Sequence, residues 1–153
     1  MKKTVIFLTV IMASAFASAN ETQVGIVLGS TTGLSAKFEL GGNRAITGVL
    51  AYSTDSTYGN YFHIDYLFER ARQFSLGNIS PAYLYYGPGI KMVNIRNGID
   101  GGKTRIAFRG PIGINFQTTN PDLEVFGEIA PSVDLSPNTS VYLDIGIGIR
   151  FRF

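Results

Sequence analysis

The last stretch of the sequence, from Val141 to Phe153, constrains the fold most. Large apolar residues fill its odd-numbered positions, whereas Tyr, Asp, Gly and Arg fill the even-numbered ones. Successive side chains of a β-strand point to opposite faces, so the stretch predicts a strand with one apolar and one polar face. A helical period of about 3.6 residues would scatter Arg150 and Arg152 among the isoleucines. The pattern therefore favours a strand.

The same alternation recurs along the chain between turns that are rich in Gly, Asn, Ser and Pro. The Gly41-Gly42-Asn43 run predicts a tight hairpin, and Pro88, which has no amide hydrogen, predicts a bulge or kink. Glu69–Ser80, Asn94–Gly102 and Pro131–Asn138 are expected to be loops. The seven earlier expected strands are Gln23–Leu28, Leu34–Leu40, Ala45–Tyr52, Tyr58–Phe68, Ala82–Val93, Thr104–Phe116 and Leu123–Ile129. The sequence thus predicts an all-β protein, an eight-stranded antiparallel up-and-down transmembrane β-barrel.

The first 19 residues are typical of a secretory signal peptide. Lys2 and Lys3 precede a short apolar run, and Ala17-Ser18-Ala19 offers a cleavage site, so the barrel domain is expected to span residues 20–153. Without the two leader lysines, Lys+Arg falls from 13 to 11, which equals the Asp+Glu count of 11. This neutral balance argues against nucleic-acid binding, and the absence of Cys excludes disulfides and thiolate metal sites.

Charged residues gather on the polar faces of the expected strands, with acids and bases nearly balanced. Eight strands enclose a space only just wide enough for side chains, so these groups are expected to pair into a polar plug. Arg105 and Arg109 are expected to lie beside Glu124 and Glu128. The predicted interior charge network is Lys37, Glu39, His63, Asp65, Lys91, Arg105, Arg109, Glu124, Glu128, Asp144, Arg150 and Arg152.

Three alternatives to a plugged membrane barrel stay open. His63 and Asp65 share a face and, with a serine, would suggest acyl transfer by a lipid-modifying enzyme. No serine can be assigned, however, so we predict no enzyme, catalytic residue, cofactor or metal site. A narrow ion path is the second alternative, and a soluble periplasmic barrel with its apolar face inside is the third. The acids Asp55, Asp100 and Asp134 are interpreted as solvated loop residues.

The pattern and length of the expected mature chain resemble the eight-stranded outer-membrane barrels typified by the OmpA transmembrane domain and OmpX. Three runs are similar to runs in an uncharacterised OmpA-like barrel family: Tyr86–Gly89, Arg109–Asn115 and Glu124–Pro131. The resemblance implies a monomeric, porin-like protein of a Gram-negative cell envelope. It also implies contact with membrane lipids and lipopolysaccharide, and a structural or surface-interaction role.

The terminal strand also resembles the signal by which the outer-membrane assembly machinery recognises its clients. The residues that carry this resemblance are Tyr142, Ile145, Ile147, Ile149, Phe151 and Phe153. Aromatic side chains elsewhere are expected to form girdles at the two membrane interfaces, namely Tyr66, Phe68, Tyr86, Phe116 and Phe153.

Overall fold

The computed structural model describes residues 21–52, 58–71 and 82–153. The expected signal peptide, the Ser53–Thr57 loop and most of the Glu69–Ser80 connection lie outside these ranges. Among the described residues, no helix is long and apolar enough to cross a membrane. The strands are β1 (Glu21–Gly29), β2 (Gly33–Gly41), β3 (Arg44–Tyr52), β4 (Tyr58–Ala71), β5 (Ala82–Tyr86), β6 (Gly89–Ile95), β7 (Thr104–Arg109), β8 (Ile112–Thr119), β9 (Asp122–Ser136) and β10 (Val141–Arg152).

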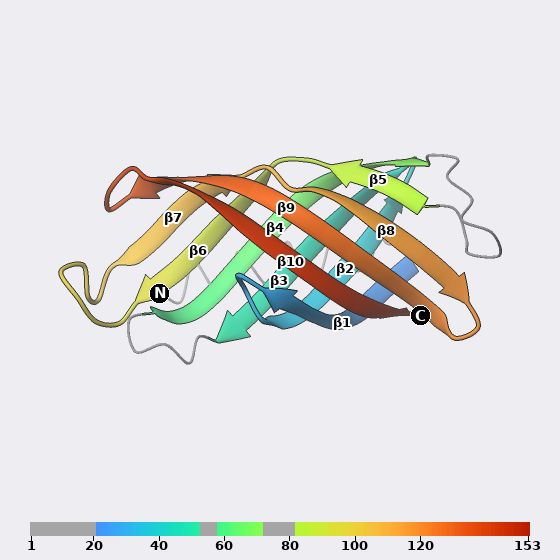
Figure 1. Cartoon of the computed structure of the whole chain (residues 1–153), viewed down its shortest axis with the longest axis horizontal. Coiled ribbons are helices and arrows are strands. Elements are labelled where there is room, and N and C mark those ends of the chain that lie inside the picture. The colour runs from blue at the N-terminus through green and yellow to red at the C-terminus, as the bar shows by residue number, and fades with distance from the viewer. Residues whose placement is uncertain (1–20, 53–57, 72–81) are drawn as a thin grey trace.

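The strands form a closed antiparallel barrel (Figure 1). β1 to β4 pair in sequence order, β9 pairs with β10, and β1 closes the ring by pairing with β10, for example Ile26 with Ile149. Both β5 and β6 pair with β4, and both β7 and β8 pair with β9, so each of these two pairs occupies one strand position. The predicted eight-stranded all-β barrel is confirmed.

Two proline positions divide strands of the barrel wall. The predicted irregularity at Pro88 is confirmed, since β5 ends at Tyr86 and β6 begins at Gly89. The interruption between β7 and β8 at Gly110-Pro111 was not predicted. Neither interruption shifts the pairing: Tyr86 faces Ile112 on one side of the break and Gly89 faces Arg109 on the other, which is the same register.

Several strands extend farther than the sequence analysis expected: β6 reaches Ile95 and β8 reaches Thr119, and the extensions of β4 and β9 alter the interior. β4 continues to Ala71, so Glu69 belongs to a strand, and β9 continues to Ser136 through Pro131. The expectation of loops at these positions was wrong. The carbonyl of Pro131 accepts a hydrogen bond from Gly110 at 2.9 Å, so the missing amide hydrogen does not end the strand.

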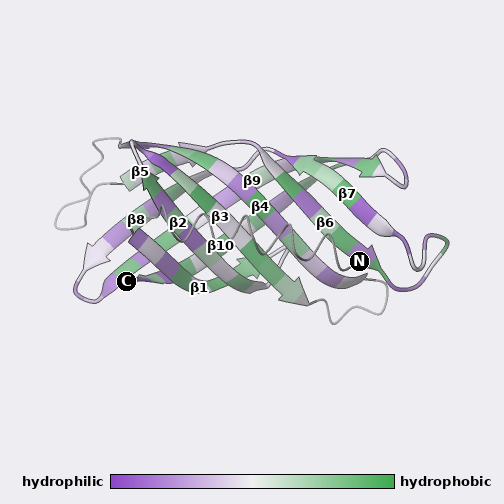
Figure 2. Ribbon diagram, turned by 180° about the vertical axis from the view of Figure 1, so that it is seen from behind, coloured by the Kyte–Doolittle hydropathy of each residue, from purple (hydrophilic) through white to green (hydrophobic). Residues whose placement is uncertain are grey.

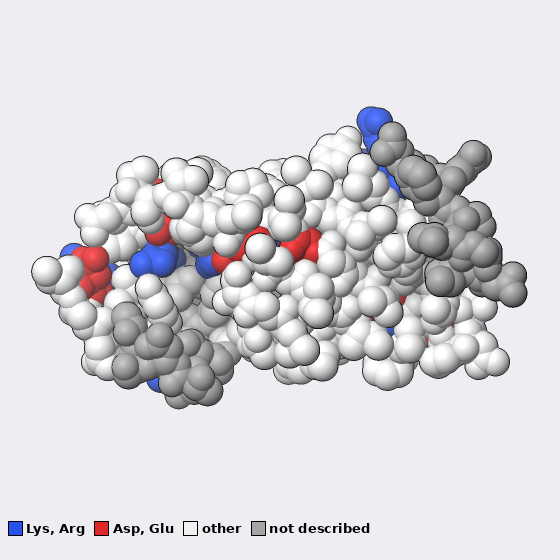
Figure 3. Space-filling model, viewed as in Figure 1, with Lys and Arg blue, Asp and Glu red and all other residues white. Residues whose placement is uncertain are grey.

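The two faces of the wall differ as the alternation predicts, and Figure 2 shows the alternating hydropathy along individual strands. On β3, whose inner face is the least polar of the set, Ala45, Thr47 and Val49 are buried inside the barrel while Leu50 is exposed. On the face seen in Figure 3, most atoms belong to uncharged residues. The apolar faces therefore point outward, and the soluble barrel with reversed faces is wrong.

Candidate functional site: the charged barrel interior

The most deeply enclosed group in the barrel is an ion-pair layer built on Glu124 of β9. Lys37 Nζ from β2 lies 2.6 Å from Glu124 Oε2, and Arg150 Nη1 from β10 lies 2.7 Å from Glu124 Oε1. The side chain of Glu124 is 0% exposed and that of Lys37 is 1% exposed. β2 and β9 are separated in the wall by β1 and β10, so the Lys37–Glu124 contact crosses the barrel interior. We call Lys37, Glu124 and Arg150 the inner layer.

Further polar groups complete the hydrogen bonding of the inner layer. Lys37 Nζ also lies 2.7 Å from Glu69 of β4, and Asn115 of β8 donates a hydrogen bond to Glu69 at 3.1 Å. Arg150 Nε donates to Ser35 Oγ at 3.0 Å, and its guanidinium carbon lies 3.7 Å from the centre of the Phe126 ring. Each buried charge thus has several partners, which offsets its desolvation.

A second layer surrounds Arg109. Its Nη2 lies 2.5 Å from Glu128 Oε1, its Nε lies 3.3 Å from Asp65 Oδ1, and its Nη1 lies 2.5 Å from His63 Nδ1. Because a guanidinium only donates, His63 Nδ1 must accept, which places the imidazole hydrogen on Nε2, 3.4 Å from Asp65 Oδ2. Tyr61 OH lies 3.0 Å from the same Nδ1. Arg109, His63, Asp65 and Glu128 form the middle layer.

The middle layer lacks the geometry of an acyl-transfer triad. In such a triad one ring nitrogen of the histidine faces the acid and the other faces the nucleophile. Here the nitrogen opposite Asp65 is occupied by Arg109 and Tyr61, and no serine of the described residues hydrogen-bonds to His63. Ligand atoms of His63, Asp65 and Glu128 come within 4.8 Å of one another, but the guanidinium already supplies the positive charge among them.

A third layer lies toward the barrel end that carries the β6–β7 and β9–β10 connections. Lys91 Nζ of β6 lies 2.8 Å from Asp144 Oδ2 of β10, and 4.8 Å and 4.5 Å from the ring centres of Tyr61 and Tyr142. Arg105 Nε lies 3.3 Å from Asp134 Oδ2. Lys91, Asp144 and Arg105 line a cavity of about 390 Å³, with Tyr58 and Thr31 among its other walls. We call Lys91, Asp144, Arg105 and Asp134 the mouth layer.

All twelve predicted network residues lie on inward-facing strand positions, but several partners differ from those expected. Arg105 and Arg109 were expected beside Glu124 and Glu128, but only Arg109 contacts either acid, namely Glu128. Arg105 pairs with Asp134, and Asp144 pairs with Lys91. The interpretation of Asp134 as a solvated loop acid was wrong, because it is buried on β9. At the opposite end of the barrel, Arg152 pairs with Glu21 at 2.5 Å.

Sequence reasoning missed Glu69, Asp134 and Glu21 as interior partners. Each lies in the same alternation phase as inward residues already recognised: Glu69 follows His63 and Asp65, and Asp134 follows Glu124 and Glu128. The alternation, extended past the expected strand ends, would have found them. The same alternation places Tyr61 and Tyr85 on the inner face, where Tyr85 OH donates a hydrogen bond to Glu128 at 3.2 Å.

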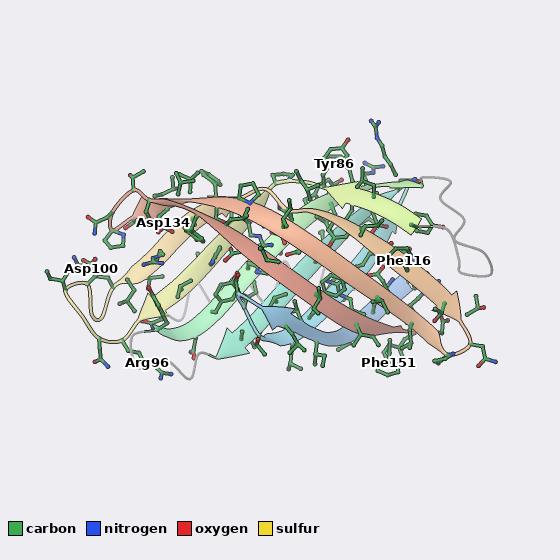
Figure 4. The ribbon with its side chains drawn as sticks, in the orientation of Figure 1. Tyr86, Arg96, Asp100, Phe116, Asp134 and Phe151 are labelled. Atoms are coloured by element: carbon green, nitrogen blue, oxygen red, sulfur yellow. The ribbon has the colours of Figure 1, made fainter. Side chains whose placement is uncertain are left out.

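The outward residues include the terminal-strand positions and the expected aromatic girdle. Ile145, Ile147, Phe151 and Phe153 are exposed, whereas Tyr142 faces the mouth cavity. The Tyr66 and Phe68 rings pack edge to face at 5.2 Å, and Phe68 lies 5.9 Å from Tyr86. Figure 4 shows Tyr86 and Phe151 projecting from the outside of the wall.

Two solved structures resemble this barrel over most of its length. The N-terminal β-barrel domain of Pseudomonas aeruginosa OprF matches with a TM-score of 0.57 and 14% identity over 87% of this chain and 96% of that chain. Neisserial surface protein A matches with a TM-score of 0.53 and 15% identity over 87% of this chain and 94% of that chain. No protein-family model and no curated protein sequence matches. The chain therefore has the eight-stranded barrel fold of these Gram-negative outer-membrane proteins.

Proposed function

We propose that this chain is a monomeric outer-membrane barrel that does not conduct ions and that acts at the cell surface in a structural or surface-interaction role. Residues 1–19 would serve as the cleaved export signal, and the terminal strand, with Ile145 to Phe153, would be read by the assembly machinery. The closed interior is supported by the inner layer, where Lys37 reaches across the barrel to Glu124, and Arg150 of the adjacent strand binds the same carboxylate, with all three side chains at most 5% exposed. An ion would have to break these pairs to pass.

The outward-facing surface supports the membrane location. Apolar side chains from all parts of the barrel wall are exposed, including Leu34, Leu50, Phe108 and Ile147. Continuous apolar surface of this kind is unfavourable in water and is matched to hydrocarbon. We therefore propose that lipid chains contact the barrel wall and that lipopolysaccharide contacts the outer rim of the barrel.

The β6–β7 connection supports the surface role. Ile99 at its tip is 100% exposed, and Asp100 beside it binds Lys103 at 2.8 Å and Asn138 of the β9–β10 connection at 3.1 Å. Figure 4 shows Asp100 at the extreme end of the molecule. We propose that the barrel end with the β6–β7 and β9–β10 connections faces the outside of the cell, so that this tip presents its exposed apolar side chain there.

Planar-bilayer conductance tests the closed interior. The refolded protein is expected to give no regular current steps, whereas a Lys37→Ala, Glu124→Ala, Arg150→Ala variant that still folds should conduct, because its central side chains are removed. Outward-facing Leu34→Ala is the matched control and should behave like the unaltered protein. Reproducible steps from the unaltered protein would overturn the closed interior and favour the narrow pore.

The location is tested separately. Membrane fractions are run on gels with and without boiling, since a closed barrel migrates differently before it unfolds. Recovery of a heat-shifted band in the outer-membrane fraction is the expected result. Release with the periplasm, without such a shift, would overturn the membrane location.

A further inference from the structure

Three sequence runs that the charge network does not fully explain come together in one patch of the wall. These are Tyr86–Gly89, Arg109–Asn115 and Glu124–Pro131, and each contains one proline. Their strand positions are neighbours: Gly89 pairs with Arg109, and Arg109 pairs with Ser132. Figure 1 shows the β5–β6 and β7–β8 interruptions beside each other along the upper edge of the barrel. Pro88, Pro111 and Pro131 therefore form a lateral row, which we call the proline seam.

The seam removes one ladder hydrogen bond from each of three adjacent strand interfaces. Amide hydrogens of Tyr66, Gly87 and Gly110 bind the carbonyls of Pro88 at 2.9 Å, Pro111 at 3.1 Å and Pro131 at 2.9 Å. In an antiparallel ladder such pairs normally exchange two bonds, but proline has no amide hydrogen to return. A wall in hydrocarbon has no water to replace these bonds, so the seam is weaker than the wall around it.

The outer face of the wall is hollowed at this seam. A cavity of about 330 Å³ is lined by Ile46, Ile64, Tyr66, Pro88, Ile90 and Phe108, with Gly89 and Asp65 at its base. A Cβ atom on Gly89 would lie 1.8 Å from Asp65 Oδ1, so only a glycine lets the Asp65 carboxylate lie this close to the backbone. The backbone at Gly89 therefore separates the hollow from the middle layer. We call this cavity the seam hollow.

The position and lining of the seam hollow define its occupant. Its rim residues Ile90 and Phe108 are exposed, and they are continuous with the apolar outer surface of the barrel. Tyr66 lies in the interior of β4, away from both strand ends, which is deeper than the interface girdle expected for it; the hollow therefore sits at the depth of lipid chains and not of headgroups. An apolar hollow that opens onto hydrocarbon excludes water, and chain packing regains the contacts that its walls lack.

We propose that the seam hollow is a docking site for one hydrocarbon chain of a membrane lipid. The chain lies against Ile64, Ile90 and Phe108, and the weakened ladder at the seam lets the wall adjust to it. This inference rests on the proposed membrane location, because the hollow would face water in any other setting.

Cross-linking to a lipid that carries a diazirine in its chain tests the proposal. The protein is folded into vesicles of phosphatidylethanolamine and phosphatidylglycerol containing this lipid, irradiated, digested and analysed by mass spectrometry. Adducts at Ile64, Ile90 and Phe108 are expected several-fold above those at Ile145 and Ile147, which face lipid on the β10 wall. Equal adduct density on the two walls would overturn the proposal.

A hollow-filling variant separates a docked chain from ordinary lipid contact. Ile46→Trp replaces an aliphatic side chain of the hollow by a bulky indole ring and is expected to reduce seam adducts to the level of the β10 wall. The control Ile147→Trp should leave the seam adducts unchanged. Persistence of the adducts in Ile46→Trp would overturn the proposal. A heat-shift gel on each sample checks insertion, so failure of the barrel to enter vesicles, which contradicts the proposed function, is distinguished from failure of docking.

Amide hydrogen exchange tests the weakness of the seam. In the folded barrel, exchange at Tyr66, Gly87 and Gly110 is expected to be faster than at Ile26 and Ile149, which face each other in the unbroken β1–β10 ladder. Pro88→Ala supplies a donor to the Tyr66 carbonyl and should slow exchange at Tyr66. Equally slow exchange in both walls of the unaltered protein would show that the ladder does not adjust and would overturn this part of the proposal.

Discussion

The inner layer and the mouth layer use the same pairing of carboxylates with cations, but they differ in access to water. The inner-layer side chains of Lys37, Glu124 and Arg150 are at most 5% exposed. In the mouth layer, Asp144 is 13% exposed and Arg105 is 29% exposed, beside a cavity open to the barrel end. An unpaired charge in the mouth can be hydrated, whereas one in the inner layer cannot. Depth, more than distance between partners, should therefore set the cost of breaking a pair.

The largest effect is expected from Glu124→Ala. The substitution leaves Lys37 and Arg150 buried without their shared acid, and breaking a buried pair in this way costs about 3–5 kcal/mol. The free energy of unfolding of the vesicle-embedded barrel, measured by urea titration, checks this. Val125→Ala on the outer face of the same strand is the control and should cost much less.

A compensated variant sharpens this expectation. Replacing all three inner-layer groups by apolar residues, with Lys37→Met, Glu124→Leu and Arg150→Met, removes the unpaired charges and should recover most of the stability lost in Glu124→Ala. If the triple variant is as unstable as the single one, packing of these side chains, and not charge burial, dominates the inner layer.

Gly113→Ala is expected to have the next largest effect. A Cβ atom there would lie 2.2 Å from the Tyr85 ring, which packs over Gly113 and hydrogen-bonds to Glu128. Overpacking of this kind typically costs about 1–3 kcal/mol. The same urea titration measures it, with Gly110→Ala as control, because a Cβ at Gly110 meets no atom within 4 Å. Equal stability of the two variants would contradict this placement of Tyr85.

Asp144→Ala in the mouth layer should cost less than Glu124→Ala. It removes the charged hydrogen-bond partner of Lys91, a loss of about 1.5–3 kcal/mol at most, and water in the cavity can partly replace it. Unfolding titrations at low and high salt check the distinction. The effect should shrink with salt for Asp144→Ala and stay nearly constant for Glu124→Ala. The same salt dependence in both would abolish the difference between the layers.

Lys103→Ala at the loop end should have the smallest effect. Its pair with Asp100 is exposed to solvent, and such pairs contribute about 0–1 kcal/mol. The midpoint of the urea titration is therefore expected to stay near that of the unaltered protein. A loss as large as that of Asp144→Ala would contradict this expectation and would mean that the pair stabilises the barrel wall as well as the connection.

The sequence predicted strand identity and facing correctly because both depend on local alternation. On β3, Ala45, Thr47 and Val49 lie inside although they are barely polar, because the period of two holds whatever the side chain. Strand ends were less predictable. Pro131 suggested a loop, yet it stays in the ladder because its carbonyl accepts a hydrogen bond from the amide of Gly110. This donor lies far away in the sequence, so the local pattern does not reveal it.

Pairing within the interior could not be predicted in the same way. Glu124 was expected beside Arg105 and Arg109. It instead binds Lys37 of β2 across the barrel interior and Arg150 of β10, the strand next to β9. Which inward side chains meet depends on stagger, strand tilt and side-chain length, and alternation contains none of these.

The sequence by itself determined the barrel, its apolar outer face, its charged inner face and the balance of acids and bases, because these follow from a two-residue period and from residue counts. The tertiary structure decided the division of the charges into inner, middle and mouth layers and the alignment of Pro88, Pro111 and Pro131 in one seam. Both features join residues far apart in the chain, so they exist only after strand closure fixes the register.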